Sequence, residues 1–126
     1  MLDSAGGLGE LALPFNYNKQ PTLARIYMSS SFVAVLMGSD SDIPIMQAGM
    51  DVLTKLEVPF EARITSAHRT PDDTRAYVQD ADARGCAVFI AGAGMAAHLA
   101  GAVAAHTLKP VIGIPIDSGP LQGLDA

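Results

Sequence analysis

FVAVLMGSDSD, residues 32–42, is the stretch that decides the fold class of this chain. Its first six residues are an apolar run rich in β-branched side chains and bounded by Gly38, which predicts a parallel strand covered on both faces. After GSDSD, Pro44 suits the first turn of a helix. Apolar residues then recur at three- and four-residue steps, as on one face of a helix: Ile43, Met46, Met50, Leu53 and Leu56. A strand that leads through a polar turn into a helix is typical of a βαβ unit.

The same alternation continues along the chain. Further strands are predicted at FEARI (60–64), AVFIA (87–91) and VIGIPI (111–116), and further helices at 71–84 and 96–108, with GAGM (92–95) as a tight turn. Thr70 is the expected N-cap of the second helix, its side-chain oxygen capping the free N–H groups. Strands alternating with helices predict an α/β fold, with right-handed crossovers and helices on both faces of a parallel sheet.

The length of 126 residues suits one domain. Residues 1–31 lack sustained periodicity and are expected to form an N-terminal arm, poorly ordered or extended, while residues 32–126 form the domain. Four strands that end in SGPLQGLDA would leave one sheet edge and one face uncovered. We therefore expect either a C-terminally incomplete domain or an oligomer partner that covers them.

Charge and composition exclude several classes of function. The formal net charge of −5 argues against a general grip on nucleic acid or on anionic lipid. The apolar stretch between Arg84 and Lys109 is interrupted by glycines and histidines, so we expect no membrane span. Cys86 is the single cysteine and cannot form an intramolecular disulfide, which favours a cytoplasmic location. No cluster has the spacing of metal ligands, so we expect no metal.

The first candidate loop is GSDSD, which supplies Gly38, Ser39, Ser41 and Asp42. In an open parallel sheet, ligands bind beyond the carboxyl ends of the strands. A helix N-terminus there favours an anion, serine hydroxyls can donate to it, and a carboxylate can accept from sugar hydroxyls. This pattern suits a phosphorylated sugar. The alternative is that Ser41 or Asp42 only caps the helix.

The second candidate loop is SAHRTP, which supplies Ser66, His68 and Arg69. Arg69 can bind phosphate or carboxylate with two hydrogen bonds, while His68 can move a proton near neutral pH. The alternative is a solvated histidine in a loop that caps the next helix.

The third candidate loop is AGAGMAAHLAG, which supplies Gly92, Ala93, Gly94 and His98. Glycines without Cβ atoms let a ligand approach the backbone closely. The loop is not the dinucleotide fingerprint, because no acidic residue follows at the required distance. His98 is as consistent with packing on a helix as with facing a ligand. We expect Cys86 and His106 to have no chemical role, Cys86 as an inert core residue and His106 as a structural or exposed one.

Together with VIGIP, these three loops resemble those of the N5-carboxyaminoimidazole ribonucleotide mutases of purine biosynthesis, the catalytic-subunit type of phosphoribosylaminoimidazole carboxylase. The resemblance runs from about Phe32 to Ala126. It implies a flavodoxin-like three-layer αβα sandwich, a homo-octamer with active sites at subunit contacts, and no cofactor. The reaction that it implies moves a carboxylate from the exocyclic nitrogen of the aminoimidazole to ring carbon 4, by way of CO2 held in the pocket.

By the same resemblance, Ser39, Asp42 and Arg69 would bind the ribonucleotide, and His68 would transfer the proton. Two positions depart from the family pattern, which often has glycine at Met95 and proline at Ala100. Three alternatives stay open. They are direct carboxylation of aminoimidazole ribonucleotide with CO2, a non-catalytic flavodoxin-like module that binds a mononucleotide, and an inactive fragment.

Overall fold

The computed structural model describes residues 31–126, so the predicted arm lies outside the described residues except for Ser31. The elements follow one another as β1 (Phe32–Met37), a 3-10 turn η2 (Asp40–Asp42), α3 (Ile43–Lys55), β2 (Phe60–Ile64), α4 (Pro71–Ala83), β3 (Cys86–Gly94), α5 (Leu99–Ala104) and β4 (Val111–Ile116). All four predicted strands and all three predicted helices are confirmed, with the differences in length given below.

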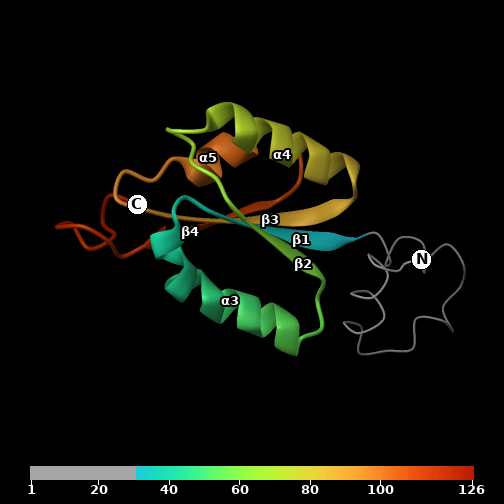
Figure 1. Cartoon of the computed structure of the whole chain (residues 1–126), viewed down its shortest axis with the longest axis horizontal. Coiled ribbons are helices and arrows are strands. Elements are labelled where there is room, and N and C mark those ends of the chain that lie inside the picture. Colours follow the sequence, from blue (N-terminus) through green and yellow to red (C-terminus); the bar gives the residue numbers. More distant parts are fainter. Residues whose placement is uncertain (1–30) are drawn as a thin grey trace, which may run out of the picture.

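The four strands form one parallel sheet in the order β2-β1-β3-β4. Helix α3 covers one face, and α4 and α5 cover the other (Figure 1). This is the α/β class and the three-layer arrangement that the sequence predicts. The chain leaves β1 toward β2 on one side and returns to β3 on the other, so the strand order reverses between β1 and β3. Such a reversal is where open α/β sheets bind their ligands.

Strand β1 contributes alternate side chains to two separate cores, which is why its whole run is apolar. Ala34 and Leu36 pack on the side of α4 and α5, in a cluster that includes Phe89. Val35 and Met37 pack on the side of α3, in a cluster that includes Met46. The prediction of a strand covered on both faces is therefore confirmed.

Strand β3 is longer than predicted, and α5 is shorter. Register pairing from Ala91↔Gly113 to Gly94↔Ile116 keeps residues 92–94 in the sheet, so the prediction of a tight turn there is wrong. The chain turns instead at Met95, whose φ is 56°. At the other end of α5, Thr107 Oγ1 donates to Asp82 Oδ2 at 2.7 Å, a contact that ties the residues after α5 to the end of α4.

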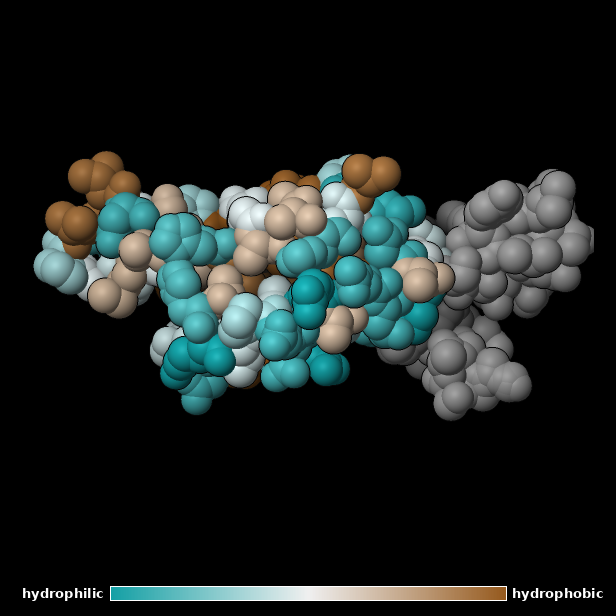
Figure 2. All heavy atoms as spheres, turned by 90° about the horizontal axis from the view of Figure 1, so that it is seen from above, coloured by the Kyte–Doolittle hydropathy of each residue, from teal (hydrophilic) through white to brown (hydrophobic). Residues whose placement is uncertain are grey.

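The surface seen from above is largely hydrophilic over its middle and carries hydrophobic patches toward the end that holds the C-terminal residues (Figure 2). Leu121 and Leu124 in that segment are 54% and 87% exposed, and Ile112 on strand β4 is 49% exposed. Within residues 31–126, no helix has both the length and the apolar character that a membrane crossing requires.

Candidate active site

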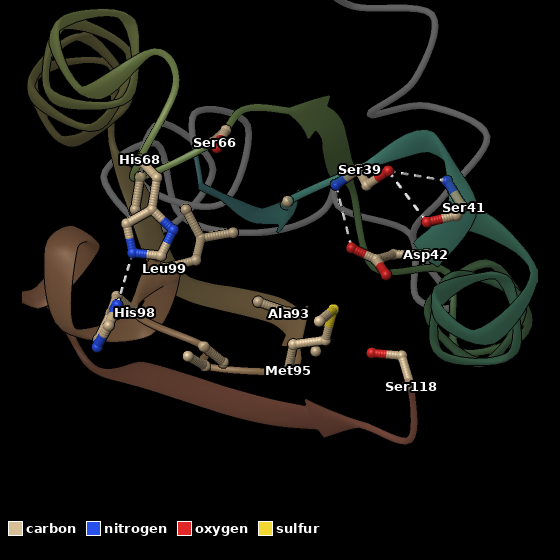
Figure 3. Close-up of a pocket in the computed structure, with 15 residues that line it drawn as sticks. Ser39, Ser41, Asp42, Ser66, His68, Ala93, Met95, His98, Leu99 and Ser118 are labelled. Atoms are coloured by element: carbon tan, nitrogen blue, oxygen red, sulfur yellow. Dashed lines mark hydrogen bonds between the residues drawn. The ribbon is translucent and has the colours of Figure 1, made fainter. Parts of the chain in front are cut away.

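A cavity of about 270 Å³ opens at the carboxyl ends of the strands, where β1, β2 and β3 lead into their loops. All the predicted site residues except Arg69 and Gly92 line it, namely Gly38, Ser39, Ser41, Asp42, Ser66, His68, Ala93, Gly94 and His98. Figure 3 shows the Ser39–Asp42 turn on one side of this cavity and the two histidines on the other. The three candidate loops therefore share one site.

The GSDSD turn is held by a reciprocal pair of hydrogen bonds. Ser39 Oγ accepts from the backbone N–H of Ser41 at 3.3 Å, and Asp42 Oδ2 accepts from the backbone N–H of Ser39 at 3.0 Å. Ser39 thus caps the 3-10 turn η2, with Asp42 as its partner. Asp42 also occupies the N-cap position of α3, but its side chain makes no cap bond there, so the alternative that Ser41 or Asp42 caps the helix is wrong. Capping and ligand binding are compatible here, because both residues line the cavity and the cap uses only one of the two carboxylate oxygens of Asp42.

The SAHRTP loop is folded back on its own first residue. Ser66 Oγ accepts from the backbone N–H of Arg69 at 3.1 Å, and the backbone N–H of Thr70 donates to the Ser66 carbonyl at 2.9 Å. Thr70 occupies the N-cap position of α4, but its hydroxyl accepts from the Ser66 N–H at 3.1 Å and does not cap the helix. The prediction of a Thr70 cap bond is therefore wrong. The hydroxyl closes the loop that presents His68 instead.

His68 and His98 form a direct hydrogen bond across the cavity. Nε2 of His68 lies 2.6 Å from Nδ1 of His98, and the two rings meet edge to face at 85° with their centroids 4.8 Å apart. Such a bond needs an N–H on one ring and a lone pair on the other, so the two rings share one proton between them. His98 was considered either to pack on a helix or to face a ligand. The structure shows it at the cavity beside His68 (Figure 3).

Two predicted site residues lie elsewhere. Arg69 is exposed and does not line the cavity. Gly92 belongs to the packing under α3, because a Cβ built on it would overlap Met46 Sδ and lie 3.2 Å from Ile116 Cδ1. Glycine at position 92 therefore lets α3 approach the sheet, whereas Gly94 lines the cavity.

Ser118 and Met95 also line the cavity, and neither was among the predicted site residues. Ser118 follows β4 as the candidate loops follow their strands, so the same strand-end rule would have found it. It lies against Gly94, where an added Cβ would overlap Ser118 Oγ. Met95 has a left-handed backbone that favours glycine, and the glycine that the family pattern often has at this position was the sequence signal for it. Ala67, Ala96, Ala97 and Leu99 complete the lining.

An ion-pair network lies at the opposite end of the sheet. Arg84 binds both carboxylate oxygens of Glu61 at 2.5 and 3.0 Å, and Tyr77 Oη donates to Glu61 Oε1 at 3.0 Å. The hydrogen bond from Arg84 holds the pKa of Glu61 below its usual range, and burial raises the pKa of Tyr77. Burial also raises the pKa of the Cys86 thiol, which is fully buried as predicted for a core residue. Within residues 31–126, no group of three or more His, Cys, Asp or Glu could hold a metal ion.

Residues 32–126 match the family model described as AIR carboxylase. The chain belongs to the AIR carboxylase family. Its relatives in this family include the N5-carboxyaminoimidazole ribonucleotide mutase of Pyrococcus abyssi, 52% identical over 94 residues that cover 75% of this chain and 54% of the relative. The phosphoribosylaminoimidazole carboxylase of Ogataea methanolica is 52% identical over 98 residues, which cover 78% of this chain and 18% of that protein.

The solved structures agree with this assignment. The crystal structure of PurE from Treponema denticola superimposes with a TM-score of 0.69 and 28% sequence identity, over 75% of this chain and 61% of that one. The predicted flavodoxin-like α/β fold is thereby supported. The AIR carboxylase chain described here spans about half the length of the archaeal mutase that it matches.

Proposed function

We propose that residues 32–126 form a ribonucleotide-binding catalytic domain that isomerises N5-carboxyaminoimidazole ribonucleotide to 4-carboxyaminoimidazole ribonucleotide in purine biosynthesis. The observation that carries this proposal is the hydrogen-bonded pair of His68 and His98 in the strand-end cavity. An imidazole whose proton is shared with a second imidazole is suited to proton transfer near neutral pH. The substrate class is inferred from the names of the mutases to which this chain is about 50% identical.

The walls of the cavity support a division of roles in binding. The hydroxyls of Ser39 and Ser41 are proposed to donate to the phosphate or ribose, and Asp42 to accept from ribose hydroxyls. Across the cavity, Ser66 is proposed to bind the same nucleotide. Arg69, which is exposed beside His68, is proposed to reach the anionic group of the substrate.

Close approach of backbone to ligand is proposed for the small residues of the first and third loops. Gly38, Ala93 and Gly94 line the cavity, and Figure 3 shows Ala93 between the serine turn and the histidines. Gly92 supports this wall from behind through its contact with Met46. His98 is proposed to contact the substrate through the ring nitrogen that does not face His68.

For this reaction the protein has to orient the substrate and CO2 and to supply one group that carries a proton. The bond between the exocyclic nitrogen and its carboxylate breaks, its electron pair stays with the aminoimidazole, and CO2 is released inside the cavity. Ring carbon 4 then attacks CO2 to form the new carbon–carbon bond. His68 takes the proton from carbon 4, which restores the aromatic ring, and a proton returns to the amine. Closure of the cavity over the bound substrate would hold CO2 at a high effective concentration.

We also propose a cytoplasmic homo-oligomer, with the octamer of the family as its form. Exposed apolar side chains on β4 and the C-terminal residues, such as Ile112 and Leu124, support an oligomer because contiguous apolar surface marks protein contacts. The cytoplasmic location is supported by a single cysteine, Cys86, which is buried. Mass measurement in solution tests the assembly.

The experiment that tests the reaction is conversion of N5-carboxyaminoimidazole ribonucleotide to its carbon 4 isomer by the purified chain, with the mass of the same sample recorded. We expect turnover by the wild type and none by His68→Asn, while His68→Asn still binds the ribonucleotide. Product formed only from aminoimidazole ribonucleotide and bicarbonate would identify a direct carboxylase instead. Nucleotide binding with no turnover from either substrate would overturn the catalytic proposal and favour a binding module.

A further inference from the structure

A pair of buried threonine hydroxyls lies directly behind the histidine loop. Thr65 follows the last residue of β2 and is 5% exposed, and Thr74 lies in the first turns of α4 and is 1% exposed. Their Oγ1 atoms are 2.6 Å apart. Neither residue lines the cavity, so neither can bind the substrate directly.

The direction of these hydrogen bonds follows from a count of protons. Thr74 Oγ1 is also 3.1 Å from the carbonyl oxygen of Thr70 and 3.4 Å from that of Ser66. A threonine hydroxyl has one proton, and carbonyl oxygens only accept. The arrangement in which all three contacts are hydrogen bonds has Thr74 donating to the carbonyls and accepting from Thr65.

Thr74 thus connects the two ends of the SAHRTP loop. Through Thr65 and the Ser66 carbonyl it contacts the start of the loop, and through the Thr70 carbonyl it contacts the end. The loop between these points presents His68, whose hydrogen bond to His98 is only 2.6 Å long. A displacement of His68 by about 1 Å away from His98 would take the two nitrogens beyond hydrogen-bonding distance.

We propose that Thr74 is a positioning residue whose buried hydroxyl holds the loop at the place where His68 bonds to His98. The kinetic part of this inference rests on the function proposed above, whereas the geometric part does not. Loss of the hydroxyl would leave the buried hydroxyl of Thr65 without this partner and would remove one of the hydrogen bonds at the Ser66 and Thr70 carbonyls, which favours a rearranged loop.

The test compares Thr74→Val, which keeps the shape of the side chain, with Thr74→Ser, which keeps the hydroxyl. Thr54→Val is the matched control, because Thr54 Oγ1 donates to the Met50 carbonyl at 3.0 Å on α3, far from the histidines in the fold. The first readout is the NMR signal of the ring N–H shared between His68 and His98. The second is the separation of kcat from KM in the mutase assay.

We expect Thr74→Val to lose or broaden the shared N–H signal and to lower kcat about tenfold with little change in KM, since misplacement of a reacting group lowers the rate of chemistry. Thr74→Ser and Thr54→Val should keep the wild-type signal and rate. An unchanged N–H signal in folded Thr74→Val would overturn the proposal, whether or not the wild type turns over substrate. If Thr74→Val does not fold, Thr65→Val, which removes the hydroxyl 2.6 Å from Thr74 Oγ1, decides the question by the same signal.

Failure of the proposed reaction would look different. In that case the wild type would show no turnover, while the shared N–H signal would still respond to Thr74→Val and not to Thr54→Val. The two proposals are therefore separated by one set of variants.

Discussion

Nε2 of His68 lies 2.6 Å from Nδ1 of His98, although thirty positions separate the two residues in the chain. His68 is in the loop after β2 and His98 is in the loop after β3, and both strands flank β1 in the sheet. Parallel pairing places the carboxyl ends of all three strands at one edge, so their loops meet there. The short bond joins the second and third candidate loops into one site.

His98 is expected to be necessary for turnover because it is hydrogen-bonded to His68. His98→Ala removes the hydrogen-bond partner of His68, and we expect kcat to fall by about tenfold or more, because general acid–base groups contribute at least that much. Steady-state kinetics on the mutase reaction measures the effect. His106→Ala is the control, since His106 does not line the cavity and should leave kcat unchanged. Equal rates for His98→Ala and wild type would remove His98 from the site.

Ser39 is expected to have two separable roles, in capping the 3-10 turn η2 and in substrate binding. Ser39→Ala should lower the free energy of unfolding by about 1 kcal/mol, the usual cost of a lost cap, and should also raise KM. Ser39→Asn keeps a capping oxygen, so it should regain most of the stability while KM stays high. Urea unfolding and substrate saturation curves give the two quantities. A normal KM in Ser39→Asn would show that Ser39 acts only as a cap.

Gly94 is expected to tolerate no side chain. A Cβ on Gly94 would overlap Ser118 Oγ and lie 3.0 Å from the Ile116 carbonyl oxygen. We expect Gly94→Ala to destabilise the fold by about 1–3 kcal/mol through overpacking. Gly101→Ala is the matched control in α5, where an added Cβ has nothing within 4 Å. It should stabilise by about 0.5–1 kcal/mol because alanine favours helix, and thermal melting curves of both variants would show these opposite signs.

Glu61 is expected to make the stability of the fold depend on acid pH. The hydrogen bond from Arg84 holds the pKa of this carboxyl below its usual range. A carboxyl with a lowered pKa in the folded state stabilises the fold above its unfolded pKa, and this contribution is lost as pH falls through the folded pKa. Urea unfolding over this acid range should therefore show a steeper loss of stability in the wild type than in Glu61→Gln. Parallel curves for the two proteins would contradict the assignment.

The strands were the part of the fold most open to prediction from sequence. FVAVLM at 32–37 has no polar residue because its side chains enter two cores, and a parallel strand with two covered faces has this composition. The end of β3 was not predictable, because Gly92–Gly94 has the composition of a turn. Only pairing with Gly113–Ile116 of β4 keeps these residues in the sheet.

The part of the candidate site that follows directly from the ends of the strands could be predicted from the sequence. Nine positions in three loops could be assigned to one cavity, because every loop after a strand in a parallel sheet lies at the same edge. The role of each residue in or near the cavity was harder to predict from the sequence. Gly92 and Gly94 look alike in sequence, yet one contacts Met46 in the core and the other contacts Ser118 at the cavity.

The alternation of strands and helices, the three polar loops and their order could be predicted from the chain, since they depend on local periodicity and on turn residues. Which side chains meet could be seen only in the folded molecule. The contacts of His68 with His98 and of Thr65 with Thr74 join residues from different elements. Such contacts depend on the strand order and on the path of the backbone in the loops, and neither leaves a local pattern in the chain.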